Sequence, residues 1–231
     1  MLETFQFFIH QMRSGYGFYL AGLPGFPAPE YNGVQIKLSH FPWQDVDNPT
    51  YESGLIKGIN DKVCSGDTVV IVGGGKGITA VKAAKRVGEQ GRVIVFEGSE
   101  SQVRKTRQTI QFNGVNEIVE VHHRVVGAAV GVYGDQESFD PLPPSDLPGC
   151  DVLELDCEGA EIEILENLEQ RPRTILVETH GMHNAPPDRI RSLLENLSYE
   201  VVSKGVADDS KSEFCIKNGI MVLTAIGQNP E

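Results

Sequence analysis

A run of β-branched residues, Thr68–Val72, leads directly into a turn that holds four glycines, Gly73-Gly74-Gly75-Lys76-Gly77. A helical pattern follows at about residues 76–87. Glycine lacks a Cβ, so the backbone of such a turn can approach a ligand closely, and the first N–H groups of the next helix have no partner inside that helix. The segment predicts a buried strand, a tight loop and a helix N-terminus that together face a ligand.

The glycine spacing and one acidic residue narrow the class of ligand. Gly73, Gly75 and Gly77 follow G-x-G-x-G rather than the G-x-G-x-x-G of dinucleotide-binding turns, and Gly77 stands where a P-loop needs serine or threonine. Glu97 ends the next predicted strand, where a carboxylate can accept hydrogen bonds from both ribose hydroxyls, and Gly98 follows it. We predict an adenosine-bearing cofactor without an essential pyrophosphate, and S-adenosylmethionine (SAM) fits best. A turn that binds nothing is the alternative for the glycines alone.

The rest of residues 61–231 predicts one α/β domain. After residues 68–72, further strands are expected at about 92–96, 118–122, 151–155, 174–177, 200–203 and 220–226, with helical patterns between most of them and a turn at Asn218-Gly219 before the last. Strands that alternate with helices form parallel sheets. We therefore expect a Rossmann-like, mostly parallel seven-stranded sheet with helices on both faces.

Residues 1–60 differ in composition and are predicted to be an N-terminal extension or cap. They are rich in glycine, proline and aromatic residues, and Phe5, Phe8, Ile9 and Met12 would share one face of a short helix. That face would pack against the main domain or against a partner subunit in a homo-oligomer, and a lid over the cofactor is the sharper alternative.

The chain has 231 residues, of which 32 are acidic and 20 are basic, for a net charge of −12. A surface of this charge repels phosphate groups, so we expect neither nucleic acid nor a membrane surface as a partner. There is no apolar run long enough to span a bilayer, and the four cysteines show no C-x-x-C spacing. These features predict a cytoplasmic protein with reduced thiols and a small-molecule substrate.

A second group of polar residues follows the strands expected at 151–155 and 174–177. Asp156, Glu158 and Glu161 come after the first of these strands, and Glu178 and His180 come after the second. The carboxyl ends of parallel strands meet at one edge of a sheet, where ligands bind, so these side chains should lie close together. Acidic residues in the first turn of a helix also have a purely structural role, because they complement the helix dipole.

These residues carry a resemblance to a known family. The chain resembles the FkbM-type SAM-dependent methyltransferases over about residues 50–225, on the evidence of Leu155-Asp156-Cys157-Glu158-Gly159-Ala160-Glu161, Val95-Phe96-Glu97, Phe139-Asp140 and Ile175-Leu176-Val177-Glu178-Thr179-His180-Gly181. The resemblance implies a class I methyltransferase fold, SAM as cofactor and O-methylation of a sugar or another small hydroxylated molecule.

The chain also departs from that family. The family usually has an acid at the end of the first strand, where this chain has Ile71, and often a lysine where this chain has Glu154. The missing acid would contact the SAM amino group. Glu52, just ahead of the domain, is a candidate replacement, although a surface acid is the plainer interpretation of that residue.

Methyl transfer to a hydroxyl requires alignment of the nucleophile and a base. Asp156, Glu178 and His180 are the candidate bases, and an ordinary histidine pKa would make activity rise through about pH 6–7. His180 and His183 with Asp156 are weak evidence for a metal, and no metal site is predicted. Two other classes stay open: a nicotinamide-dependent oxidoreductase, and a degenerate SAM-fold protein that binds a partner without catalysis.

Overall fold

The computed structural model describes residues 28–36, 47–127 and 141–228. A seven-stranded sheet runs through the domain in the order β5-β4-β3-β6-β7-β9-β8. The first five strands in that order are parallel to one another, and β9 is antiparallel to both β7 and β8. The strands are β3 (Thr68–Val72), β4 (Arg92–Glu97), β5 (Val119–His123), β6 (Val152–Leu155), β7 (Thr174–Glu178), β8 (Tyr199–Val206) and β9 (Met221–Gly227). The predicted fold class is confirmed.

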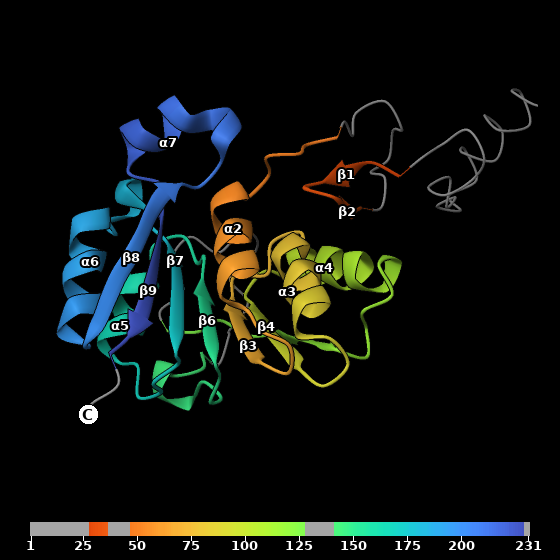
Figure 1. Ribbon diagram of the computed structural model, residues 1–231, viewed down its shortest axis with the longest axis horizontal. Helices are drawn as coiled ribbons and strands as arrows, with labels where there is room; N and C mark the ends of the chain where they lie inside the picture. The colour runs from red at the N-terminus through yellow and green to blue at the C-terminus, as the bar shows by residue number, and fades with distance from the viewer. Residues whose placement is uncertain (1–27, 37–46, 128–140, 229–231) are drawn as a thin grey trace, which may run out of the picture.

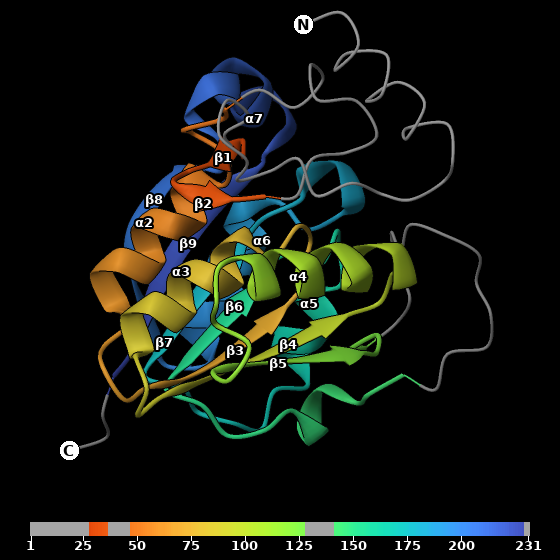
Figure 2. The same cartoon turned by 90° about the vertical axis from the view of Figure 1, so that its right-hand side faces the viewer.

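Helices cover both faces of this sheet (Figure 1). One face carries α2 (Ser53–Lys62), α3 (Ile78–Val87) and α4 (Glu100–Phe112), and the other carries α5 (Glu161–Glu166) and α6 (Pro187–Asn196). Figure 2 shows α3 and α4 above the strands β3, β4 and β5. Every helix in the described ranges is too short or too polar to cross a bilayer.

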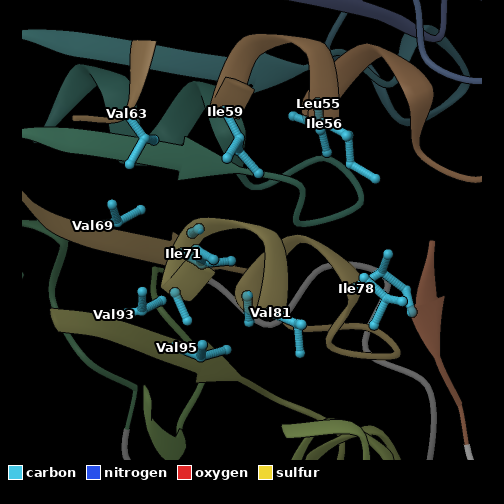
Figure 3. Close-up of a cluster of buried hydrophobic side chains, with 14 of the residues drawn as sticks. Leu55, Ile56, Ile59, Val63, Val69, Ile71, Ile78, Val81, Val93 and Val95 are labelled. Atoms are coloured by element: carbon cyan, nitrogen blue, oxygen red, sulfur yellow. The ribbon is translucent and has the colours of Figure 1, made fainter. Parts of the chain in front are cut away.

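The two layers follow from the alternation of side chains along the central strands. Val69 and Ile71 point toward α2 and α3, whereas Val70 and Val72 point toward α5 and α6. Both sets are buried, so β3 reads as a continuous apolar run, as is typical of a parallel strand covered on both sides. Figure 3 shows the apolar cluster between the sheet and the helices α2 and α3. Leu55, Ile59 and Val63 belong to this cluster together with Ile71 and Ile78.

Helix α2 crosses the boundary between residues 60 and 61 that the sequence predicts. Its residues Leu55, Ile56 and Ile59 are buried in the main core, and a Cβ on Gly58 would lie 2.7 Å from Leu176 Cδ2. The described remainder of the extension includes the short strands β1 (Glu30–Tyr31) and β2 (Val34–Gln35). The helix predicted around Phe5–Met12 and the Phe139-Asp140 step both lie outside the described residues.

The turn predicted at Asn218-Gly219 is confirmed at Gly219, but Asn218 is the last residue of a helix rather than part of a hairpin turn. Helix α7 (Ser212–Asn218) lies between β8 and β9, and Gly219 caps it with a φ of 65°. Gly219 adopts the left-handed conformation that favours glycine in both settings. The helix escaped sequence analysis because only Cys215 is buried while Phe214 and Ile216 are exposed, which leaves no periodic apolar face.

Candidate functional site

A cleft opens at the carboxyl ends of β3, β4 and β6. In open α/β sheets ligands bind at this edge. Its walls come from the loops after these strands, from the residues that precede α2, and from the segment after β5. The lining residues are Tyr51, Glu52, Val72, Gly73, Gly75, Phe96, Glu97, Gly98, Gln102, Arg124, Val125, Val126, Asp156, Cys157, Glu158 and Ala160.

The glycines of the loop after β3 have two different roles. Gly73, Gly75 and Gly77 have φ values of 98°, 50° and 81°. A Cβ on Gly73 would lie 1.7 Å from the carbonyl oxygen of Asp156, and one on Gly77 would lie 3.1 Å from the backbone of Thr106. Gly73 and Gly77 therefore let the loop pack tightly against β6 and α4. Around Gly75 there is more room, with Glu52 Oε1 the nearest atom at 3.8 Å, and Gly77 does not line the cleft.

Glu97 holds the loops after β3 and β4 together. The backbone N–H of Gly75 donates to Glu97 Oε2 at 3.0 Å, and the N–H of Ser99 donates to Oε1 at 2.7 Å. The residue is only 9% exposed but lines the cleft, as does Gly98. A carboxylate oxygen has two acceptor positions, so each oxygen of Glu97 retains one for a ligand.

Glu52, which precedes the glycine loop in the sequence, lines the same cleft. It has a left-handed backbone, with φ of 51°, and immediately precedes α2. Burial raises its pKa well above the ordinary range, and the charges of Asp156 and Glu154 add to the effect, while a hydrogen bond from Tyr51 and the charge of Lys76 oppose it. Glu52 is half-buried, and a cationic partner would stabilise the charged form of its carboxyl group. Ile71, which the sequence places at the end of β3, lies fully buried in the core.

Asp156, Glu178 and His180 come together at the ends of β6 and β7, as the strand order predicts. His180 Nε2 lies 3.5 Å from Asp156 Oδ1 and 3.7 Å from Glu178 Oε1, and Glu158 Oε2 is 3.9 Å away. His180 Nδ1 lies 2.7 Å from Glu161 Oε1. Of the three candidate bases only Asp156 also lines the cleft, so it connects this cluster to the cleft.

The electrostatics of the cluster correct one expectation. Burial lowers the pKa of His180, but the hydrogen bond with Glu161 and the charges of Asp156, Glu161 and Glu158 outweigh it and raise the pKa to about 9. His180 is therefore an imidazolium near neutral pH, and the predicted neutral base of ordinary histidine pKa is wrong. Burial raises the pKa of Asp156 to about 6, against the opposing charge of His180.

Sequence reasoning missed several residues of the cleft. Tyr51 was overlooked although it precedes Glu52, and its phenol hydrogen-bonds with Glu52. Arg124 was overlooked although it follows β5, a third parallel strand that ends at the same edge. The position after each parallel strand was the signal that could have found it.

No family model matches the chain, and no curated protein matches it. Solved structures do match. The ribosomal protein L11 methylase from Lactobacillus delbrueckii subsp. bulgaricus superposes with a TM-score of 0.54 and 15% identity, over 91% of this chain and 100% of that one. A SAM-dependent O-methyltransferase from Thermotoga maritima gives a TM-score of 0.52 and 17% identity, over 80% and 68%.

An O-methyltransferase from Bacillus cereus, solved in complex with S-adenosylhomocysteine (SAH), gives a TM-score of 0.50 and 16% identity, over 78% of this chain and 82% of that one. At these identities the likeness concerns the fold. One of these structures is named for methylation of a ribosomal protein, and the other two are named only as O-methyltransferases. The shared fold therefore does not determine which molecule accepts the methyl group. The chain has the Rossmann-like fold of class I SAM-dependent methyltransferases.

Proposed function

We propose that this protein is a SAM-dependent methyltransferase that methylates a hydroxyl group of a small molecule. The observation that carries the proposal is the cleft itself. A glycine loop, the buried carboxylate of Glu97 at the end of the next strand and the half-buried carboxylate of Glu52 line one cavity at the carboxyl edge of β3, β4 and β6. The neighbours of the same fold include SAM-dependent O-methyltransferases.

The residues present fit the polar groups of SAM. Glu97 has acceptor positions left for the two ribose hydroxyls, and Gly98 lies beside it. Glu52 would pair with the ammonium group of the cofactor, in place of the acid that Ile71 replaces. Tyr51 and Glu52 belong to residues 1–60, so we propose that this extension closes one side of the site. When bound, SAM would supply an activated methyl group.

The chain's own contribution to methyl transfer is alignment and proton removal. Methyl transfer from a sulfonium is an in-line displacement, in which holding the acceptor in place gives most of the rate. We assign the role of proton acceptor to the group of Asp156, Glu178 and His180, through Asp156, because only this member lines the cleft.

The charges around the cleft favour a neutral or cationic acceptor. Glu52, Glu97, Asp156 and Glu158 line it, whereas Arg124 is the only lysine or arginine among the lining residues that the structure describes. A polyanion such as RNA would be repelled by these carboxylates and by the net charge of −12. A small hydroxylated molecule, such as a sugar or a secondary metabolite, is the proposed substrate.

Glu97→Ala is expected to weaken SAM binding by about 1–3 kcal/mol, because charge-assisted hydrogen bonds to the ribose would be lost. Isothermal titration with SAM, SAH and 5′-methylthioadenosine measures the effect. All three ligands carry the ribose, so all three should lose affinity in this variant. An unchanged affinity for all three would refute the role of Glu97.

Glu52→Gln is expected to give a different pattern with the same ligands. SAM and SAH carry an ammonium group and should lose about tenfold or more in affinity, since a charged partner is removed. 5′-Methylthioadenosine has no amino-acid moiety and should bind as it does to the wild type. Equal losses for all three ligands would show that Glu52 supports the cleft structurally and does not hold the ammonium group.

A further inference from the structure

Three side chains at the ends of β6 and β7 are arranged like metal ligands. Asp156, Glu178 and His180 each offer one ligand atom, and these atoms all lie within 4.8 Å of one another. Glu178 ends β7, and Asp156 and His180 lie within two residues of the ends of β6 and β7, which are adjacent parallel strands. His180 is 6% exposed and Glu178 is 9% exposed, so the group is held in the protein interior rather than on a flexible surface.

The distances inside the group suit a shared ion better than direct hydrogen bonds. His180 Nε2 is 3.5 Å from Asp156 Oδ1 and 3.7 Å from Glu178 Oε1. Hydrogen bonds between nitrogen and oxygen are usually 2.7–3.2 Å long. Two ligands placed about 2.1 Å from one ion at a tetrahedral angle are about 3.4 Å apart. The observed spacing is close to that of ligands around a metal.

Glu161 orients the histidine for this role. Its Oε1 lies 2.7 Å from His180 Nδ1, so this nitrogen carries a proton and donates it to Glu161. The other nitrogen, Nε2, faces Asp156 and Glu178, and an ion bound there would displace the proton of Nε2 into solvent. Metal-binding histidines commonly donate their second ring N–H to a carboxylate, which fixes the ring and makes the ligand nitrogen more basic. Glu161 is itself 0% exposed and accepts a second hydrogen bond from the N–H of Cys157 at 3.1 Å.

Glu178 supplies a second, independent observation. Its side chain is only 12% exposed, yet its only ion pair within the described residues is the 3.7 Å approach of Oε1 to His180 Nε2. No hydrogen bond to its carboxyl oxygens occurs within the described part of the chain. A buried carboxylate without hydrogen bonds is costly, and an ion between it and Asp156 would remove that cost.

We propose that Asp156, Glu178 and His180 bind one divalent transition-metal ion. One imidazole nitrogen and two carboxylate oxygens form a mixed donor set, and imidazole favours transition metals over Mg²⁺ and Ca²⁺, which prefer oxygen ligands alone. Three protein ligands leave coordination positions free, as in metal sites that act on substrates. Glu158, whose Oε2 is 3.9 Å from His180 Nε2, is near enough to be a fourth ligand.

The position of this metal site beside the cleft suggests a role for the ion in activating the acceptor. Asp156 belongs both to the three ligands and to the lining of the cleft, so the ion would lie beside the cleft. A divalent ion there would bind the acceptor's hydroxyl oxygen and lower its pKa, so that the proton passes to the carboxylate oxygen of Asp156 that does not bind the ion before the hydroxyl oxygen attacks a methyl group. Metal binding itself does not depend on the proposed methyl transfer, and the two can fail separately.

Titration of the metal-free full-length protein with Mn²⁺, followed by calorimetry and by electron paramagnetic resonance, tests the site. The wild type is expected to bind one Mn²⁺ per chain, and Zn²⁺ should displace it, whereas Mg²⁺ should compete at least 100-fold less well. His180→Gln and Glu178→Gln should each weaken Mn²⁺ binding by at least 100-fold, and Glu161→Gln by about 10–100-fold.

His183→Gln is the matched control. His183 stacks on His180 with ring centroids 6.1 Å apart, and its Nδ1 lies 3.5 Å from Glu158 Oε2, but it is not one of the three ligands. It should retain Mn²⁺ affinity within about threefold. Loss of affinity in His183→Gln with full retention in His180→Gln would overturn the assignment.

A measurement on the wild-type protein tests the site even if the substituted variants fail to fold. Pulsed electron paramagnetic resonance of Mn²⁺-loaded wild type should show coupling to one ¹⁴N nucleus, from His180. No saturable binding of Mn²⁺ or Zn²⁺ up to millimolar concentration, or bound Mn²⁺ without nitrogen coupling, would overturn the proposal. Either result leaves SAM binding by Glu97 and Glu52 to be judged on its own titrations.

Discussion

Replacing Gly73 by alanine is expected to destabilise the native state by more than about 4 kcal/mol, which few single substitutions do. The new Cβ would lie 1.7 Å from the carbonyl oxygen of Asp156, and that backbone atom belongs to a central strand end that cannot move away cheaply. The φ of 98° adds backbone strain for any residue with a side chain. Urea denaturation followed by circular dichroism measures the loss.

Gly66→Ala is the control for backbone strain alone. Gly66 also has a positive φ, of 86°, but a Cβ there would meet no atom within 4 Å. Gly66→Ala should therefore lower the free energy of unfolding by only about 1–2 kcal/mol. If the two variants unfold at the same urea concentration, the close packing of the glycine loop against β6 does not hold.

Glu154→Gln is expected to change how stability depends on pH. Glu154 is 1% exposed on β6, and burial, with a smaller contribution from the charge of Asp156, raises its pKa to about 8 against the opposing effect of the nearby Thr79 hydroxyl. Because the folded-state pKa lies above that of the unfolded chain, near 4.3, the folded state holds a proton that the unfolded state releases. The stability this proton contributes is full below about pH 4 and is lost as pH rises to about 8.

Between about pH 4 and pH 8 the free energy of unfolding of the wild type should fall by an amount on the order of 3–5 kcal/mol through this residue. Glu154→Gln should not show this fall. Unfolding free energies at pH 5 and pH 8, in the presence of EDTA, give the comparison. Glu200→Gln removes an exposed carboxylate from β8 and serves as the control. A constant difference between wild type and Glu154→Gln at both pH values would contradict a protonated Glu154.

The fold could be predicted because its strands are nearly continuous apolar runs. Val69, Val70, Ile71 and Val72 are all buried, and such runs between helical patterns have few other arrangements. The order of strands then places Asp156, Glu178 and His180 at one edge without further information. By contrast, α7 has a single buried residue, Cys215, so no apolar period marks it in the sequence.

The finer features of the site depend on contacts between distant parts of the chain. The pKa of His180 is set by Glu161, 19 residues earlier, and the sequence does not show that these two side chains meet. Glu52 reaches the cleft because α2 packs on the sheet through Leu55 and Ile59, so its place follows from the direction of that helix. Its use as a ligand for the cofactor stays a prediction.

The most direct test of the central claim is calorimetric titration of the full-length wild-type protein with SAM and SAH, with NAD⁺ and NADP⁺ as comparison ligands. The proposed cleft predicts saturable binding of SAM and SAH with one site per chain, and no binding of the dinucleotides, because the glycine spacing lacks the pyrophosphate-binding pattern. Absence of SAM binding at millimolar ligand, or binding of a nicotinamide dinucleotide in its place, would contradict the assignment of this cleft to SAM.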